Sequence, residues 1–331
     1  MKHPLILLLL GFCVIPGAGA EPPYPPSPII KSVRFAPTAS IIRKAADSDN
    51  WPMTWADDGD IYTSYGDGWG FEPRIPKKVS QGFAKIIGLP EQFVGINIRT
   101  SSGERFGDGA KGAKASGMLM VDGVLYIWIR NTGNATLAWS GDHGATWEWG
   151  FKFTESFGSP AFLNFGKNYE GARDDYVYTY SQDGSSAYES NDGLILARCP
   201  KSRIKDASSY QFFAGLDASN QPQWASALAE RKPVFAYPHH CQRVDAVYHP
   251  GIKRYLLALG FNHEGGWGLF EAPEPWGPWT TAYCTESWDL PGTHGYRIPA
   301  KWIDPNDNSF YLVFSGVGIN DAFCVRKVML N

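Results

Sequence analysis

Residues 115–131 read ASGMLMVDGVLYIWIRN, and this stretch decides the fold. An apolar run leads into an Asp-Gly pair, and a second run of β-branched and aromatic side chains follows. An Asp-Gly pair between two such runs is typical of a tight turn that joins two antiparallel strands. The stretch therefore predicts a β-hairpin whose register is set by its turn.

The same two-strand unit occurs four more times along the chain, at residues 51–67, 158–183, 243–262 and 297–316. Apolar runs that predict additional strands follow these units, at residues 82–88, 135–151, 193–199, 266–283 and 321–330. A single hairpin cannot bury both of its faces, so repeated units of this kind must stack on one another. Five units with about four antiparallel strands each predict an all-β fold, a five-bladed β-propeller.

The fifth unit reaches the C-terminus one strand short of the others. A propeller closes its ring to remove exposed sheet edges. We therefore expect an N-terminal segment, either residues 29–36 or residues 40–45, to add a strand to the last sheet.

A second marker of the fold is the sequence Ser-Gly-Asp-His-Gly-Ala-Thr-Trp at residues 140–147. It matches the Asp-box turn of sialidase-like and other propellers. In this turn the Asp side chain caps the backbone, the Gly allows a positive φ angle and the Trp packs between blades. Asp142 is accordingly predicted to stabilise the fold rather than to take part in catalysis.

The start of the chain predicts export from the cell. An apolar segment at residues 5–14 is followed by Ala18-Gly-Ala20, a small-residue cleavage site. We expect a signal peptide at residues 1–20, a Pro-rich leader at residues 21–28 and a single propeller domain at residues 29–331. The protein would then be secreted or periplasmic after cleavage near Ala20. The apolar segment is too short to span a bilayer, so no stable membrane association is expected.

Four cysteines lie beyond this leader, at positions 199, 241, 284 and 324. Their wide spacing resembles no metal cluster, and one or two disulfides or buried free thiols are both compatible with an exported protein. The sequence also lacks a dinucleotide fingerprint and a phosphate-binding glycine-rich loop. We therefore expect neither a metal ion nor a cofactor.

Charge and aromatic content indicate the class of partner. The formal net charge is −3 and no basic run is present, which argues against nucleic acid, because a nucleic-acid-binding face needs a surplus of Lys and Arg. Aromatic residues make up 15% of the chain, with 13 Trp. Part of this set packs blades, and the remaining flat rings suit the apolar faces of sugars. We expect a monomer that binds a polysaccharide or oligosaccharide.

Propeller geometry collects polar residues at one rim. The first strand of each blade lines the central channel, and its start shares a rim with the loop that leaves the second strand. Asp49 precedes the first unit and Asp67 ends it, so both side chains could reach the same axial pocket. Glycoside hydrolysis uses two carboxyl groups, one as proton donor and one as nucleophile or base. Asp49 as nucleophile or base and Asp67 as proton donor are the predicted catalytic pair.

Other polar residues at this rim are predicted to bind the substrate. They are Lys114, Arg130, Asn131, Asp183, Arg243, His263, Glu264, Tyr296 and Arg297. The basic residues also suit a lyase, in which Arg neutralises a uronate carboxylate and a Tyr or His removes the proton at C5. The residues considered for that proton transfer are Tyr188, Tyr296, His240, His263 and His294.

Several stretches of the sequence carry a family resemblance. They are Asp49-Asn-Trp-Pro-Met-Thr-Trp-Ala-Asp-Asp-Gly, Tyr62-Thr-Ser-Tyr-Gly-Asp-Gly-Trp-Gly, Lys114-Ala-Ser-Gly-Met, Phe162-Leu-Asn-Phe-Gly-Lys-Asn, Ala272-Pro-Glu-Pro-Trp-Gly-Pro-Trp-Thr and Ala322-Phe-Cys-Val-Arg-Lys-Val. From about Asp49 to the C-terminus, the chain resembles a family of exported bacterial propeller proteins long known as a domain of unknown function.

This resemblance implies a five-bladed fold. For part of the family it also implies endo-D-arabinanase activity on mycobacterial-type arabinan, with two catalytic aspartates at the propeller mouth. Asp49 and Asp67 are the positions here that fit that pair. The dense set of Arg, Lys and His side chains leaves an acidic glycan open as an alternative to a neutral arabinan.

Three functions remain after these observations. The first is a secreted glycoside hydrolase that cleaves an extracellular polysaccharide, arabinan-like or acidic, with two aspartates. The alternatives are a polysaccharide lyase that acts on a uronate and a non-catalytic propeller that binds glycans or serves at the cell surface.

Overall fold

The computed structural model describes residues 21–316 and 321–331. Its regular structure consists of twenty-four strands and seven 3-10 helices of three residues each, η1 to η7. The predicted all-β class is confirmed. None of the helices in the described ranges is long and apolar enough to cross a membrane. The signal peptide predicted at residues 1–20 lies outside the described residues.

Two four-stranded antiparallel sheets form the first part of the fold. The first contains β3 (Met53–Trp55), β4 (Ile61–Tyr65), β5 (Gly82–Ile87) and β6 (Val94–Ile98). The second contains β7 (Lys114–Val121), β8 (Val124–Arg130), β9 (Thr136–Ser140) and β10 (Glu148–Lys152). In both sheets each strand pairs with the next one along the chain.

A ten-stranded sheet follows, built from two antiparallel series that one parallel pair joins. One series contains β11 (Ala161–Asn164), β12 (Tyr176–Gln182), β13 (Asn191–Pro200), β14 (Gln211–Leu216) and β15 (Pro222–Ala225), with β16 (Phe235–Cys241) along β13. The other contains β17 (Arg243–His249), β18 (Arg254–Gly260), β19 (Trp267–Ala272) and β20 (Thr280–Thr285). The joining pair is β11 with β17, the first strand of each series.

The last sheet combines both ends of the chain. It contains β21 (His294–Arg297), β22 (Ile303–Asp304), β23 (Ser309–Ser315), β24 (Phe323–Leu330), β1 (Val33–Phe35) and β2 (Ile42–Lys44). Both β1 and β2 pair antiparallel with β24. The predicted N-terminal addition to the last sheet is thus confirmed, and both of the segments considered for it contribute a strand.

The five predicted two-strand units are all present as antiparallel pairs. They form β3–β4, β7–β8, β11–β12, β17–β18 and β21–β23. The sequence pattern does not predict β6 or β15, because both are edge strands with few buried residues. It also misses β14 and β16.

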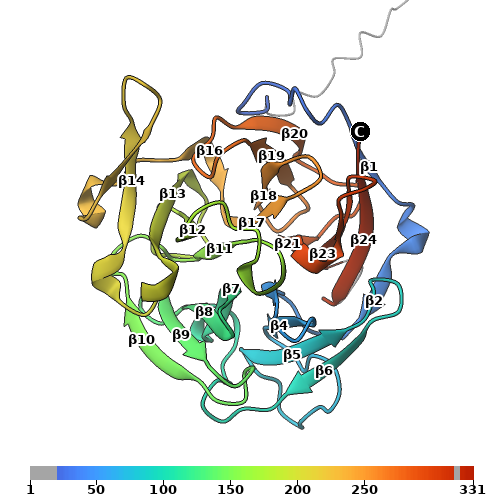
Figure 1. Ribbon diagram of the computed structural model, residues 1–331. Helices are drawn as coiled ribbons and strands as arrows, with labels where there is room; N and C mark the ends of the chain where they lie inside the picture. The colour runs from blue at the N-terminus through green and yellow to red at the C-terminus, as the bar shows by residue number, and fades with distance from the viewer. Residues whose placement is uncertain (1–20, 317–320) are drawn as a thin grey trace, which may run out of the picture.

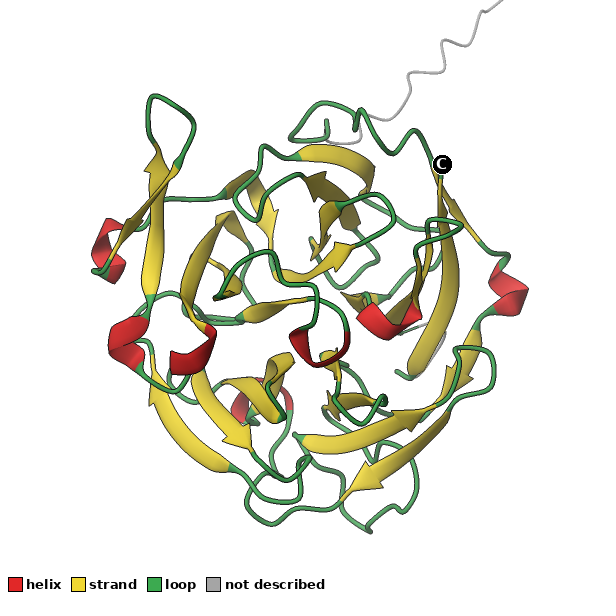
Figure 2. Cartoon of the chain, in the orientation of Figure 1, coloured by secondary structure: helices red, strands yellow, loops and turns green. Residues whose placement is uncertain are grey.

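The chain passes around a common centre, so that the sheets follow one another in sequence order (Figure 1). Strands β7, β11, β17 and β21 lie towards this centre, whereas β6, β10, β14 and β20 lie further out. The helices are confined to short segments between strands (Figure 2). This arrangement brings the first strand of every series to the middle of the molecule.

Polar side chains tie the inner strands of neighbouring sheets together. Asn50 Nδ2 donates to the Ala115 carbonyl at 2.5 Å, and Asn164 Nδ2 donates to the Met118 carbonyl at 3.1 Å. Gly117 permits a close approach, since a Cβ at this position would lie 2.7 Å from the Cα of Ala161. The centre is therefore narrow, and side chains at the starts of the inner strands are forced into proximity.

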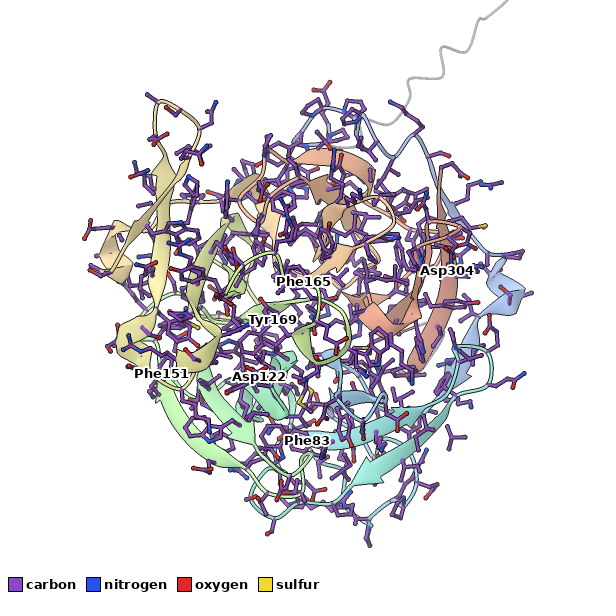
Figure 3. The ribbon with its side chains drawn as sticks, viewed as in Figure 1. Phe83, Asp122, Phe151, Phe165, Tyr169 and Asp304 are labelled. Atoms are coloured by element: carbon purple, nitrogen blue, oxygen red, sulfur yellow. The ribbon has the colours of Figure 1, made fainter. Side chains whose placement is uncertain are left out.

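Aromatic side chains fill the spaces between neighbouring sheets (Figure 3). Trp51 packs edge-on against Phe323 with ring centroids 5.0 Å apart, and Trp267 stacks on Tyr296 at 4.7 Å. Burial of each large apolar side chain stabilises the fold by roughly 1.5–3 kcal/mol. All four cysteines of the described residues are free, so the structure agrees with the free-thiol alternative.

The sheets surround a central axis, and the connection between β11 and β12 covers one end of this axis. This connection contains η3 (Lys167–Tyr169), which packs against β3 and β7. Asn168 Oδ1 accepts a hydrogen bond of 2.9 Å from the N–H of Gly123, in the turn between β7 and β8. Tyr169 and Asp122 accordingly lie near the middle of Figure 3. The strand starts lie at the other end of the centre.

The turn at residues 140–147 links two sheets. Asp142 Oδ1 accepts hydrogen bonds of 2.8 Å from the Thr146 N–H and from Ser140 Oγ, and Oδ2 accepts one from Thr146 Oγ1 at 2.6 Å. Gly144 has a φ angle of +89°. Trp147 stacks on Phe83 of the neighbouring sheet at 4.6 Å. The turn therefore positions an aromatic contact between sheets.

We predict that Asp142→Asn lowers the free energy of unfolding by about 1 kcal/mol, because the amide replaces an acceptor that receives three hydrogen bonds. Urea denaturation of the purified variant measures this change. Any catalytic turnover per folded molecule should be unaffected. Unchanged stability would show that Asp142 does not support the fold. A loss of turnover in folded protein would show that it does more than support the fold.

Candidate active site

The starts of the inner strands meet at the end of the centre opposite η3. Lys114 begins β7, Arg243 begins β17 and His294 begins β21. Asp49 lies four residues before β3, where its backbone pairs with that of Gly66. We call the following group the charged centre: Asp49, Asp67, Lys114, Arg130, Arg243, His294 and Asp321.

Asp49 is held so that its carboxylate faces His294. Two backbone hydrogen bonds of 3.0 and 2.8 Å join Asp49 to Gly66. Residue 66 must be a glycine, because a Cβ atom at this position would lie 2.6 Å from Asp49 Oδ1. Oδ2 lies 3.7 Å from His294 Nε2, and Oδ1 is buried without a hydrogen-bond partner among the described residues. Since an unpaired buried acceptor is costly, this oxygen is suited to contact a ligand.

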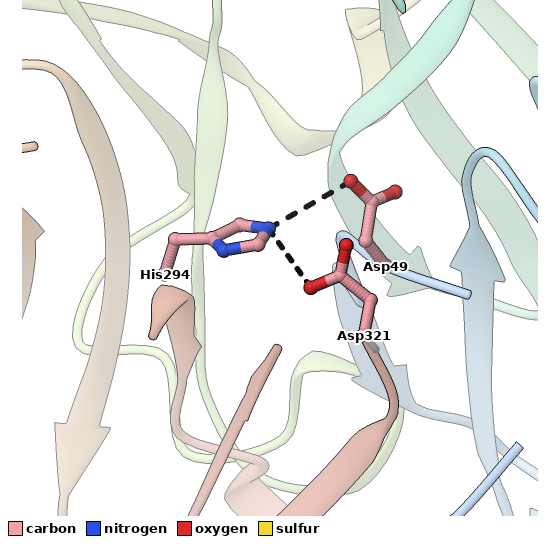
Figure 4. Close-up of side chains that lie close together, drawn as sticks. All are labelled: Asp49, His294 and Asp321. Carbon is pink, nitrogen blue, oxygen red and sulfur yellow. Dashed lines mark ion pairs between the residues drawn. The ribbon is translucent and has the colours of Figure 1, made fainter. Parts of the chain in front are cut away.

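Asp321 forms a group of three with Asp49 and His294 (Figure 4). Its Oδ1 lies 3.7 Å from His294 Nε2. One polar atom of each residue lies within 4.8 Å of the others. Asp321 precedes β24, which belongs to the last sheet, whereas Asp49 precedes the first sheet. The two carboxyl groups therefore meet where the ends of the fold come together.

The pKa values of these two carboxyl groups are shifted in opposite directions. Burial alone would raise the pKa of Asp49, but its interaction with nearby His294, aided by the charges of Lys114 and Arg243, lowers it to about 2. Desolvation raises the pKa of Asp321, and the negative charge of Asp49 adds to this effect against the opposing charge of His294. Asp49 therefore stays ionised while Asp321 keeps its proton to higher pH.

Asp67 lies on the same hairpin as Asp49 and takes part in an ion pair. Its Oδ1 lies 2.5 Å from Nζ of Lys114, whose side chain is only 2% exposed. Ser48 Oγ accepts hydrogen bonds from two backbone N–H groups in the loop that follows Asp67 and thereby holds it. Lys114 also lowers the pKa of Asp49, so it connects the two predicted catalytic residues. Such an ion pair suits positioning and charge balance, and proton donation by Asp67 stays a prediction.

Two buried guanidinium groups lie beside these carboxylates. Arg130 is 1% exposed and Arg243 is 6% exposed, and both lie over the ring of Tyr188, at 5.1 and 5.6 Å from its centroid. Asn131 Nδ2 donates to the Tyr188 hydroxyl at 3.1 Å. Desolvation, followed by the charge of Arg130, lowers the pKa of Arg243 to about 9. The predicted binding residues Arg130, Asn131 and Arg243 thus surround one aromatic ring.

His263 and Glu264 lie in the exposed loop after β18. The His263 ring lies 5.0 Å from the His294 ring. Desolvation and the positive charge of Arg243 lower the pKa of His263, which keeps the imidazole neutral. Glu264 extends into solvent, and its backbone N–H donates to Asn262 Oδ1 at 2.8 Å. His263 therefore borders the charged centre, whereas Glu264 has no contact with it in the described residues.

Asp183 and Arg297 were predicted to bind substrate, and both have protein partners. Asp183 Oδ1 lies 2.9 Å from Arg231 Nε. Arg297 Nη1 donates to the Val244 carbonyl at 3.0 Å and lies 3.5 Å from Asp245 Oδ1. These contacts fix neighbouring segments of the fold, so we do not include the two residues in the charged centre.

Tyr296 lies in the core rather than at the rim. Its ring is 3% exposed and stacks on Trp267. Its hydroxyl donates to the Thr293 carbonyl at 3.1 Å. The structure therefore gives this predicted binding residue the surroundings of a packing residue.

Asp321 is the member of the charged centre that sequence reasoning missed. The apolar pattern of residues 321–330 indicates only a strand, and Asp321 stands at its start. Its position after the fifth unit, at the rim where the other strands exit, is the signal that could have revealed it. The repeat also places the start of the fifth unit at Arg297, whereas β21 begins at His294 and has an irregular register between these two residues.

Asp49, His294 and Asp321 also have the spacing of a three-ligand cation site. Lys114 and Arg243, however, lie near enough to Asp49 to lower its pKa. Positive charges at this distance oppose the binding of a divalent cation. The surroundings therefore favour proton transfer by these three residues over metal binding.

A hollow of about 580 Å³ lies away from the charged centre, between Asp122 and residues 168–175. Charged groups in its wall pair with each other in solvent, as Lys201 does with Asp175 at 3.0 Å. Exposed pairs of this kind contribute little energy and little reactivity. We therefore assign the chemistry to the charged centre.

Residues 119–317 match a protein family described as Domain of unknown function (DUF4185). The match covers more than half of the chain, so the protein belongs to this family. Arg130, Arg243 and His294 lie inside the matched stretch, whereas Asp49 and Asp67 precede it. No curated protein matches the chain.

Solved structures share the fold at low sequence identity. The RS223 beta-xylosidase is 13% identical, with a TM-score of 0.50 over 91% of this chain and 95% of that chain. The GH43_1 enzyme from Xanthomonas citri is 13% identical, with a TM-score of 0.50 over 91% of both chains. An alpha-L-arabinofuranosidase from Podospora anserina in complex with cellotriose is 10% identical, with a TM-score of 0.51 over 87% and 92%. At such identities the likeness concerns the fold alone.

The lowered pKa of Asp49 predicts a pH-dependent contribution to stability. Because the pKa falls from an ordinary 3.8 to about 2 on folding, ionised Asp49 stabilises the protein above pH 3.8, and this contribution is lost towards pH 2. At neutral pH we expect Asp49→Asn to be less stable than the wild type by about 2 kcal/mol. Urea denaturation at a series of pH values measures the difference.

Asp175→Asn provides a control, because this carboxylate is 87% exposed and its pair with Lys201 contributes little to stability. A difference between wild type and Asp49→Asn that stays constant as the pH falls would contradict the ionised state assigned to Asp49.

Proposed function

We propose that this protein is an exported glycoside hydrolase, built on a five-bladed β-propeller, that cleaves an extracellular polysaccharide. Asp49 acts as nucleophile or base. We propose Asp321 as proton donor in place of Asp67, which the sequence predicted for this role and which pairs with Lys114. Asp67 and Lys114 hold Asp49 in place. The glycan is arabinan-like or acidic, and the signal peptide is removed near Ala20.

The arrangement of the sheets supports five blades. Two sheets have four strands, and the ten-stranded sheet divides at its parallel pair into two further series that each begin at the centre. The last sheet, completed by β1 and β2, supplies the fifth. A beta-xylosidase and an alpha-L-arabinofuranosidase have a similar fold over most of the chain, which supports a glycan as the substrate.

The observation that carries the enzymatic proposal is the opposed shift of two facing carboxyl groups. The pKa of Asp49 is lowered to about 2, and the pKa of Asp321 is raised. A pair of titratable groups whose environments separate their pKa values is the arrangement that acid–base catalysis requires. One group is then ready to attack or to accept a proton, and the other is ready to donate one.

The spacing of the pair favours retention at the anomeric carbon. One oxygen atom of each carboxyl group lies within 4.8 Å of the other, so the two groups are close enough for a retaining mechanism, in which they lie about 5–5.5 Å apart. In this scheme Asp49 attacks the anomeric carbon while Asp321 protonates the leaving oxygen. Asp321 then takes a proton from water, which displaces Asp49 and releases the sugar.

A lyase is the second candidate, because of one observation. Burial would raise the pKa of Tyr188, but the charge of Arg130 and the hydrogen bond from Asn131 overcome this effect and lower it. A tyrosine of lowered pKa beside two arginines suits proton removal next to a carboxylate. Only elimination forms an unsaturated uronate, so ultraviolet absorbance of the products separates the two reactions.

We predict that Asp49→Asn and Asp321→Asn each reduce turnover by about 10²–10⁴-fold or more, because each removes a group that reacts directly. Asp67→Asn should reduce it as well, through loss of the ion pair with Lys114. Release of reducing ends from a panel of arabinans, xylans and polyuronates measures turnover. Asp175→Asn, in the hollow between Asp122 and residues 168–175, is the matched control and should keep wild-type activity. Addition of a chelator should leave the rate unchanged.

Circular dichroism and thermal denaturation confirm that the variants are folded. Full turnover in folded Asp49→Asn or Asp321→Asn would refute the assignment of the pair. Binding without product formation by the wild type on every glycan of the panel would favour a non-catalytic, glycan-binding propeller.

A further inference from the structure

Arg130 and Arg243 are buried cations of the charged centre. No carboxylate of the described residues forms an ion pair with either side chain, in contrast to Lys114, which Asp67 neutralises. Arg130 Nε and Nη1 and Arg243 Nε are buried and have no hydrogen-bond partner in the described part of the chain. Burial of an unpaired charge costs several kcal/mol. The charge of Asp49, which favours ionised Arg243, offsets part of this cost, and the fold bears the remainder.

The two arginines converge on one place. Both guanidinium groups lie over the Tyr188 ring, and Asn131 holds the hydroxyl of that ring. Arg243 also lies near enough to Asp49 and Asp321 to affect their pKa values, so this arginine adjoins the proposed reacting carboxylates. Tyr188 itself is 37% exposed, which leaves part of the ring open to a ligand. Unpaired donors, an aromatic face and reacting groups thus line the same site.

Guanidinium groups bind planar oxyanions through paired hydrogen bonds, and a carboxylate matches their fork geometry. The open part of the Tyr188 ring offers an apolar surface for a sugar ring. We infer that the substrate is an acidic glycan and that a uronate carboxylate binds between Arg130 and Arg243 beside Tyr188. This inference rests on the proposed function for its link to catalysis, whereas the anion site itself is testable without turnover.

The first test measures binding of monosaccharides to the wild-type protein, by isothermal titration calorimetry. The probes are the methyl glycosides of D-glucuronate and D-galacturonate, their methyl esters and the corresponding 6-sulfated neutral sugars. The ester has the same ring without the charge. At least one uronate should bind about 10-fold or more tightly than its ester, because one charge-assisted contact is worth about that factor. Added salt should weaken this binding.

The second test uses Arg130→Gln and Arg243→Gln. Each should weaken uronate binding by about 10- to 100-fold and leave binding of the ester unchanged. Arg130→Gln should also keep or raise the melting temperature, because it removes a buried charge that forms no ion pair with a described residue. Arg203→Gln is the matched control, since Arg203 is exposed and pairs with Asp206 on the surface.

Three results would overturn the inference: equal binding of uronates and esters, wild-type uronate binding by both arginine variants, or preference for the sulfated sugars. A failure of the hydrolase proposal looks different. In that case the wild type binds uronates in a charge-dependent manner but releases no reducing ends from polyuronates. Cleavage of neutral glycans without any preference for uronates would support hydrolysis and refute the acidic substrate.

Discussion

The electrostatic interaction of Asp49 with His294, Lys114 and Arg243 is the constraint on which the site depends. Inner strands approach one another closely because small and polar residues, such as Gly117 and Asn50, replace bulky side chains between them. Charged side chains at the starts of these strands therefore cannot move apart into solvent. The carboxylate of Asp49 keeps its charge against the penalty of burial because its neighbours are positive. Gly66 leaves the space in which this carboxylate lies.

Because these groups lie close together and are buried, their pKa values shift in different directions. Asp321, beside the ionised Asp49, holds its proton more firmly, and His263, beside Arg243, loses its proton more easily. Negative charge is nevertheless scarce among the described residues at this end of the centre, since Asp67 is already paired with Lys114. A substrate that brings its own negative charge would balance Arg130 and Arg243. The charge of the bound glycan thus affects the ionisation of the groups on which the reaction depends.

The architecture was largely predictable from local sequence signals. Turns rich in Asp, Gly, Asn or Pro between apolar runs mark the hairpins locally, so all five two-strand units were found, and the missing last strand revealed the N-terminal addition to β24. Edge strands such as β6 were missed because they are half exposed and lack a regular apolar alternation. Within the site, Asp49 and Lys114 were found from their positions before or at inner strands. Asp321 was not, because its role arises from contact with Asp49 and His294, which lie far away in sequence.

The ionisation of Asp49 and Asp321 is the central claim, and carbon-13 nuclear magnetic resonance of aspartate carboxyl groups measures it directly. Resonances are assigned with Asp49→Asn and Asp321→Asn, and a titration series gives each pKa in the folded protein. The account predicts that Asp49 titrates near 2 and Asp321 above the ordinary value of 3.8. Equal pKa values, or an Asp321 that loses its proton before Asp49, would contradict the account.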